Sequence, residues 1–161
     1  MVFVTVGTQT LGFERLLNEV QNLVKKGIID DNVEIQTGFT KFHSATSQIT
    51  CFNFLSQEEM DFKIKNAEYI ITHGGVGCIL GALHYQKKII AVPRLKEFRE
   101  HINNHQLEII ENFSNAGFLL SVYNIKELEM VVKQIGNFIP NKYIGTNTKL
   151  IAEIKNTIDL L

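Results

Sequence analysis

The sequence is poor in cysteine and in net charge, and it contains no long apolar run. Its two cysteines, Cys51 and Cys78, form neither a disulfide framework nor a C-x-x-C metal pair, so we expect reduced thiols in a cytoplasmic protein. A formal net charge of −1 does not favour a nucleic-acid partner held by bulk charge. Because no apolar stretch approaches the roughly 18 residues that span a bilayer, we expect any membrane association to be peripheral or through a partner.

The sequence also lacks the features that separate domains. Only two prolines occur, and no low-complexity segment or linker is present. The 161 residues, of which 45% are hydrophobic and 20% charged, are enough to bury one core. We therefore expect a single domain over residues 1–161.

Short apolar runs alternate with segments of helical spacing along the whole chain. The runs predict strands over 2–6, 33–37, 49–54, 69–72, 89–92 and 117–122. Between them the spacing predicts helices, one opened by the capping box of Ser56 and Glu59 and one capped by Asn124. Residues 39–48 have no period and are expected to form a loop, and residues 149–161 are expected to form a last amphipathic helix.

This alternation predicts an α/β fold with a doubly wound, mostly parallel six-stranded sheet of the Rossmann-like kind. The strand order expected for six strands is 3-2-1-4-5-6, which places the first and fourth strands side by side at the topological switch point. The turns that follow these two strands are 7–10 and 73–77. We expect both turns to meet in one crevice, where an anionic ligand such as a nucleotide binds.

The turn His73-Gly74-Gly75-Val76-Gly77 lies between an apolar run and a helical pattern. Unpaired N–H groups at a helix start attract anions, and glycine lets a ligand approach the backbone. The pattern is neither G-x-G-x-x-G nor G-x-x-x-x-G-K-[ST]. Taken alone, this turn can equally be a tight connection that binds nothing.

Three segments together resemble the C-terminal, donor-binding half of GT-B glycosyltransferases of family 28. They are Val4-Thr5-Val6-Gly7-Thr8 with Phe13-Glu14-Arg15-Leu16, then 71–77, and then 93–106, which is the most specific of the three. The likeness covers nearly the whole chain. It extends to the small catalytic subunits of two-component bacterial polysaccharide glycosyltransferases, whose eukaryotic relatives add the second N-acetylglucosamine to dolichol-linked chitobiose.

The resemblance implies a site at the ends of the first, fourth and fifth strands. For binding of the UDP-sugar it implies Gly7, Thr8, Gly74, Gly75, Val76, Gly77, Cys78 and Arg94. For catalysis it implies His73, with His105 and Gln106 contacting the donor sugar. No metal or other cofactor is expected, because the UDP-sugar is a substrate.

The same residues also have simpler roles open to them. His73 can serve simply to hold the turn rigid, and His105 and Gln106 can serve simply to cap a helix. Arg94 can belong to an ordinary solvated loop or contact the partner, and Cys78 is better explained as a small residue at a helix start than as a nucleophile. Gly81 departs from the family, where many relatives carry a glutamate that holds the ribose hydroxyls, so the ribose must be held by another residue.

The function implied by the resemblance is that of a GT-B enzyme split into two proteins. This chain would bind the donor of an inverting transfer, and a membrane-associated subunit would supply the acceptor-side domain and the general base. The acceptor would be a lipid-linked saccharide of bacterial exopolysaccharide or capsule synthesis, at the inner face of the plasma membrane. The sequence does not indicate which sugar is transferred.

Two other functions are alternatives to this one. An NAD-dependent oxidoreductase is disfavoured, because Gly7-Thr8-Gln9-Thr10-Leu11-Gly12 is not the dinucleotide motif and Thr37-Gly38 offers no acidic residue after the second strand. A regulatory or scaffolding subunit that has lost turnover stays open, and Gly81 is the one feature that favours it.

Overall fold

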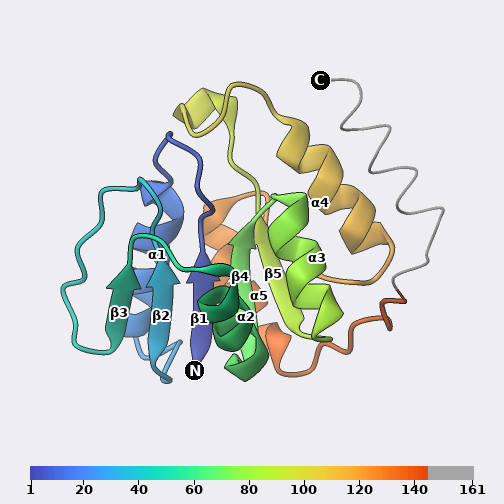
Figure 1. Cartoon of the computed structure of the whole chain (residues 1–161), viewed down its shortest axis with the longest axis horizontal. Helices are drawn as coiled ribbons and strands as arrows, with labels where there is room; N and C mark the ends of the chain where they lie inside the picture. Colours follow the sequence, from blue (N-terminus) through green and yellow to red (C-terminus); the bar gives the residue numbers. More distant parts are fainter. Residues whose placement is uncertain (145–161) are drawn as a thin grey trace.

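The computed structural model describes residues 1–144, and the helix expected over 149–161 lies outside this part of the chain. Six strands form one sheet in the order β3-β2-β1-β4-β5-β6, and all five neighbouring pairs are parallel. The strands are β1 (Val2–Thr5), β2 (Val33–Gln36), β3 (Ile49–Phe52), β4 (Tyr69–His73), β5 (Lys88–Val92) and β6 (Leu120–Ser121). The predicted doubly wound order is confirmed (Figure 1).

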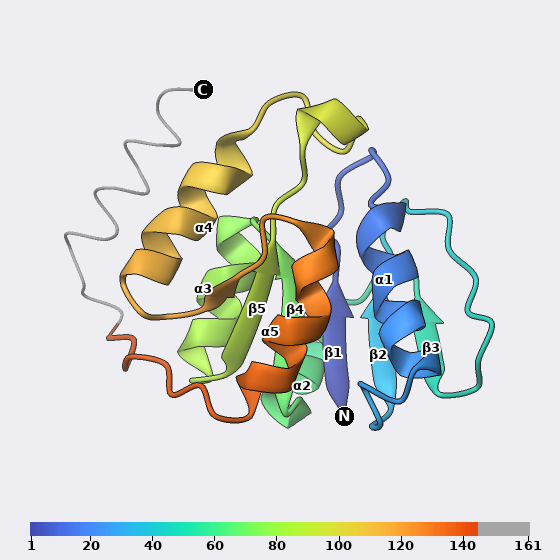
Figure 2. The same cartoon turned by 180° about the vertical axis from the view of Figure 1, so that it is seen from behind.

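Helices cover both faces of the sheet, as parallel strands require. On one face lie α2 (Gln57–Asn66), α3 (Val76–His84) and α4 (His105–Asn115), and on the other lie α1 (Glu14–Lys25) and α5 (Leu128–Ile135) (Figures 1 and 2). Successive side chains of a strand point to opposite faces. In β1, Val2 and Val4 pack on the side of α1 and α5, whereas Phe3 packs on the side of α2, α3 and α4.

Two predicted boundaries differ from the structure by more than two residues, whereas the bounds of the first five strands differ by two residues or fewer. The last strand was expected over 117–122, but β6 pairs only at Leu120–Ser121, because Gly117 adopts a positive φ of 72° in the turn that ends α4. Asn124 does cap a helix, but its side chain accepts from the N–H of Lys126 at the start of a 3₁₀ helix, η2 (Ile125–Glu127). The α-helix α5 begins only after that turn, at Leu128.

The helix α2 begins as its sequence predicts. Ser56 Oγ accepts from the N–H of Glu59, and the Glu59 carboxylate accepts in return from the N–H of Ser56, at 3.2 and 2.8 Å. This capping box fixes where α2 starts, directly after the carboxyl end of β3. The helix α2 contacts α3, and both helices begin beyond the carboxyl ends of the strands that precede them.

Candidate functional site

The turns after β1 and β4 meet around the imidazole of His73, as predicted for the switch point. A Cβ atom on Gly7 would lie 2.7 Å from both Cε1 and Nε2 of that ring, and a Cβ on Gly75 would overlap its Nε2. Only glycine fits at these two positions without moving His73. Gly7 also has a positive φ of 75°, which other residues rarely adopt. The histidine side chain therefore lies between the two turns and fixes their distance from each other.

His73 is uncharged at neutral pH. It is buried at the end of β4, with 9% of its surface exposed. Burial and the nearby positive charge of Arg94 lower its pKa from 6.5 to about 4. A neutral imidazole retains one N–H that can donate a hydrogen bond without adding positive charge to the site.

The N-terminus of α3 presents backbone N–H groups that no side chain of the described part of the chain caps. Gly75 is the N-cap residue, and α3 continues with Val76, Gly77 and Cys78 in its first turn. A Cβ on Gly77 would meet no atom of the described residues within 4 Å, so the space beside this turn is open in that part of the chain. Orphan N–H groups and the helix dipole make this turn suitable for an anion. Burial raises the pKa of the Cys78 thiol, which favours its neutral form over a nucleophilic thiolate.

Gln106 ties the glycine turn to the segment that leaves β5. Its Oε1 accepts from the N–H of Gly74 at 2.9 Å and from the N–H of Arg94 at 3.0 Å, and the side chain is buried. A Cβ on Gly74 would lie 2.7 Å from the Cβ of Gln106, so glycine is needed for this close approach. The structure thus gives Gln106 a positioning role. The contact with the donor sugar that the resemblance implies stays a prediction.

Arg94 lies inside the protein and not in a solvated loop. Its side chain is fully buried. The guanidinium donates to the carbonyls of Val6 (2.7 Å), Leu11 (2.7 Å), Gly12 (3.1 Å) and Glu100 (3.1 Å). It therefore holds the loop after β1 against the loop after β5, and these two loops lie side by side in Figure 1. A direct contact with the diphosphate stays a prediction, because in this structure the guanidinium donates its hydrogen bonds to these four carbonyls.

A partly buried ion pair that the sequence did not indicate connects the same two loops. Arg15 of α1 binds both carboxylate oxygens of Glu100 at 2.8 Å and also donates to the carbonyl of Pro93. Glu100 accepts in addition from the N–H of Leu95. Arg15 was part of the motif that carries the resemblance, but only the fold shows that its partner lies 85 positions later.

The remaining predicted residues lie on the rim of this site. Thr8 is exposed in the loop after β1. His105 opens α4 as predicted, where its N–H donates to Asn103 Oδ1 at 3.3 Å. The His105 Nδ1 atom is buried and has no hydrogen-bond partner among residues 1–144, and it lies 4.0 Å from a carboxylate oxygen of Glu108. The fold thus brings the predicted residues together at one edge of the sheet, and their contacts with a ligand stay predictions.

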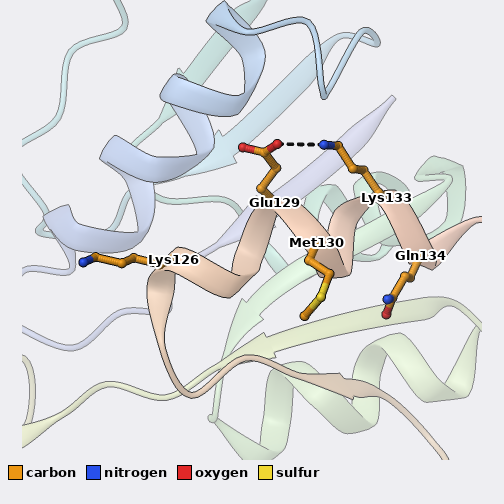
Figure 3. A pocket seen from close by; sticks show the side chains of 5 residues that line it. All are labelled: Lys126, Glu129, Met130, Lys133 and Gln134. Carbon is orange, nitrogen blue, oxygen red and sulfur yellow. Dashed lines mark hydrogen bonds and ion pairs between the residues drawn. The ribbon is translucent and has the colours of Figure 1, made fainter.

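Other features of the described residues do not compete with this site. A groove of about 390 Å³ lies over α5, on the face of the sheet opposite α3 (Figure 3). Of its three charged residues, Lys126, Glu129 and Lys133, the carboxylate of Glu129 is already paired with Lys133 at 2.7 Å and with Lys26 at 3.0 Å. Within residues 1–144 there is no cluster of three or more potential metal ligands. No helix in the same range has the length and apolar character needed to cross a membrane.

Comparison with known proteins gives a consistent assignment along the chain. Residues 1–160 match the glycosyltransferase family 28 C-terminal domain. Two curated relatives are each called UDP-N-acetylglucosamine transferase subunit ALG13. The one from Candida albicans (strain SC5314 / ATCC MYA-2876) is 31% identical over 122 residues, which cover 76% of this chain and 38% of the relative. The one from Yarrowia lipolytica (strain CLIB 122 / E 150) is 28% identical over 170 residues, which cover 95% of this chain and 83% of the relative.

Solved structures share the fold at low sequence identity. A crystal structure of the glycotransferase of kitacinnamycin has a TM-score of 0.63 at 13% identity, and the match covers 97% of this chain and 37% of that protein. The NMR solution structure of ALG13 has a TM-score of 0.61 at 18% identity, with 93% of this chain and 92% of that one covered. At these identities the likeness concerns the fold alone. The α/β fold predicted from the sequence is confirmed.

Proposed function

Because the chain belongs to the glycosyltransferase family 28 C-terminal domain family, as its three motifs predicted, we propose that it is the donor-binding catalytic subunit of a UDP-sugar-dependent glycosyltransferase. The observation that carries this proposal is the uncapped start of α3 beside the turn after β1. A diphosphate there would accept from the N–H groups of Val76, Gly77 and Cys78. The names of the two curated relatives make UDP-N-acetylglucosamine the first donor to test.

The proposed reaction is a displacement at the anomeric carbon of the sugar. The acceptor oxygen forms a bond to that carbon, the bond to the diphosphate oxygen breaks, and its electron pair leaves with UDP. Inversion follows when attack and departure lie on opposite sides of the sugar. The N–H groups of α3 are already oriented, so they stabilise the charge that develops on the leaving diphosphate with little reorganisation.

Other residues of the site would orient the donor. Gln106 and Arg94 hold the glycine turn and the adjoining loops at fixed positions, which places the sugar for in-line attack. His105 lies at the start of α4, where we propose that it contacts the donor sugar. The proton of the acceptor hydroxyl would go to a base on a second subunit, so no base is assigned in this chain.

The proposal includes that second subunit. The described residues form one Rossmann-like domain, whereas the structural match covers only 37% of the glycotransferase of kitacinnamycin. Both curated relatives are also called subunits. We propose a membrane-associated partner that binds a lipid-linked acceptor and holds this chain at the cytoplasmic face of the membrane. A role in bacterial exopolysaccharide or capsule synthesis is proposed from the sequence resemblance alone.

Two matched variants test the anion site. Gly77→Asp places a carboxylate in open space within the first turn of α3, where acidic residues favour helix formation, so the fold should be retained. The carboxylate should repel the diphosphate and lower UDP affinity at least tenfold. Gly136→Asp is the control, because its Cβ would also meet nothing within 4 Å but lies at the end of α5. Calorimetric titration of the full chain with UDP measures both variants.

The outcome separates the proposal from its alternatives. Equal UDP affinity in the Gly77→Asp variant and the parent would place the nucleotide elsewhere. Transfer is then measured with UDP-sugars and membranes that contain or lack the candidate partner. Full transfer by the purified chain alone would contradict the split enzyme. Donor binding with no transfer in the presence of the partner would instead support a regulatory subunit.

A further inference from the structure

A cavity of about 200 Å³ lies between the first turns of α2 and α3. From α2 it is lined by Gln57, Met60 and Asp61, and from α3 by Gly77, Cys78 and Gly81. The cavity adjoins the candidate anion site, because Gly77 and Cys78 belong both to its wall and to the first turn of α3. A group attached directly to a diphosphate at that turn would reach the cavity.

The cavity has a charged side chain on the α2 side and no side chain at Gly81 on the α3 side. Asp61 is the one charged residue among its lining residues, and its Oδ1 accepts from Nε2 of Gln57 at 2.9 Å, which orients the carboxylate. On the α3 side, Gly81 contributes no side chain. Among residues 1–144, a Cβ there would meet only Cδ1 of Ile64, at 3.8 Å, so these residues leave the space in front of Gly81 free.

Other carboxylates of α2 are engaged elsewhere or point away. Glu59 belongs to the capping box, where it accepts from the N–H of Ser56. Glu58 is exposed and lines a different hollow, together with Phe52 and Phe62. Asp61 is thus the carboxylate of α2 that is available to a ligand inside the cavity.

We propose that this cavity receives the ribose of the donor and that the Asp61 carboxylate accepts hydrogen bonds from the ribose hydroxyls. The inference rests on the proposed function, since it takes the diphosphate to bind at the start of α3. The volume of the cavity is below the roughly 300–1,000 Å³ of pockets that enclose whole drug-sized ligands, so the cavity suits a fragment such as a pentose. An acidic side chain is the usual partner of ribose hydroxyls in nucleotide-binding α/β folds.

The test compares UDP with 2′-deoxy-UDP and 3′-deoxy-UDP in calorimetric titrations of the full chain. A hydrogen bond to a charged group contributes enough for about a tenfold difference in affinity, so the parent should bind UDP about tenfold more tightly than at least one deoxy analogue. Asp61→Asn should weaken UDP about tenfold and bring that ratio close to one. Glu58→Gln removes the same charge from the same helix and should leave the ratio as in the parent.

A second variant tests the location without altering Asp61. Gly81→Leu fills the free space before Gly81 and should weaken UDP and its deoxy analogues alike, while binding of inorganic pyrophosphate stays unchanged. Parent-like UDP affinity in this variant, or a parent-like ratio in Asp61→Asn, would overturn the inference and leave the proposed function standing. A parent chain that binds no UDP would overturn both.

Discussion

Removal of the Gln106 side chain should destabilise the protein strongly, because two buried backbone groups depend on it. In Gln106→Ala, the N–H groups of Gly74 and Arg94 lose the one oxygen that accepts from both of them. A buried donor left unpaired costs about 1–3 kcal/mol. Two such donors cost about 2–6 kcal/mol, a large part of the roughly 5–15 kcal/mol that stabilises a typical domain.

This loss is large enough to be measured by thermal unfolding of the purified chain. For a protein of this size, 1 kcal/mol changes Tm by about 2–4 °C, so Gln106→Ala should unfold about 5–20 °C below the parent. Gln134→Ala is the control, because Gln134 is an exposed residue of α5. An exposed substitution of this kind changes the free energy of unfolding by no more than about 0.5 kcal/mol.

A third variant separates the positioning role of Gln106 from a contact with the sugar. Gln106→Glu keeps a side-chain oxygen that can accept from Gly74 and Arg94, so most of the stability should remain. It lacks the amide NH₂ group, so transfer should fall if that group donates to the donor sugar, while UDP affinity changes little. A Gln106→Ala variant that unfolds at the parent temperature would refute the reasoning about the two buried N–H groups.

Two further predictions concern His73 and the glycines that surround it. Gly75→Ala should lower the free energy of unfolding, because the new Cβ would overlap His73 Nε2. Gly77→Ala should not lower it, because its Cβ meets no described residue within 4 Å. Equal denaturation midpoints of the two variants would contradict this. The pKa of His73 is lowered to about 4, so between pH 4 and 6.5 the unfolded chain binds more protons than the folded one. The free energy of unfolding should therefore rise by up to about 1.4 kcal/mol per pH unit across this window and remain constant above it. The His73→Gln variant should lose this slope. Denaturant titrations at several pH values that give both proteins the same slope would disprove the lowered pKa of His73.

The order of helices and strands could be predicted from the sequence because it depends on local patterns. Apolar runs and helical spacing marked every strand and every α-helix of the described residues, and Ser56 with Glu59 marked the start of α2. Even the meeting of the turns after β1 and β4 followed from strand order alone, through the general topology of doubly wound sheets. The boundary at Gly117 was missed because apolar residues there pack in the core without pairing in the sheet.

The roles of individual polar residues were decided only by the tertiary structure. Arg94 stands among charged residues in the sequence, which left both donor binding and a solvated loop open, and the fold shows that its guanidinium binds the carbonyls of Val6 and Leu11, more than 80 positions away. The sequence placed Gln106 in the site but did not indicate its contact with Gly74, and Asp61 is an ordinary helix residue until the fold places a cavity beside it. A local pattern records which face of an element is apolar. It does not record which distant backbone groups will need a hydrogen-bond partner, since that need arises only when separate segments are buried against each other.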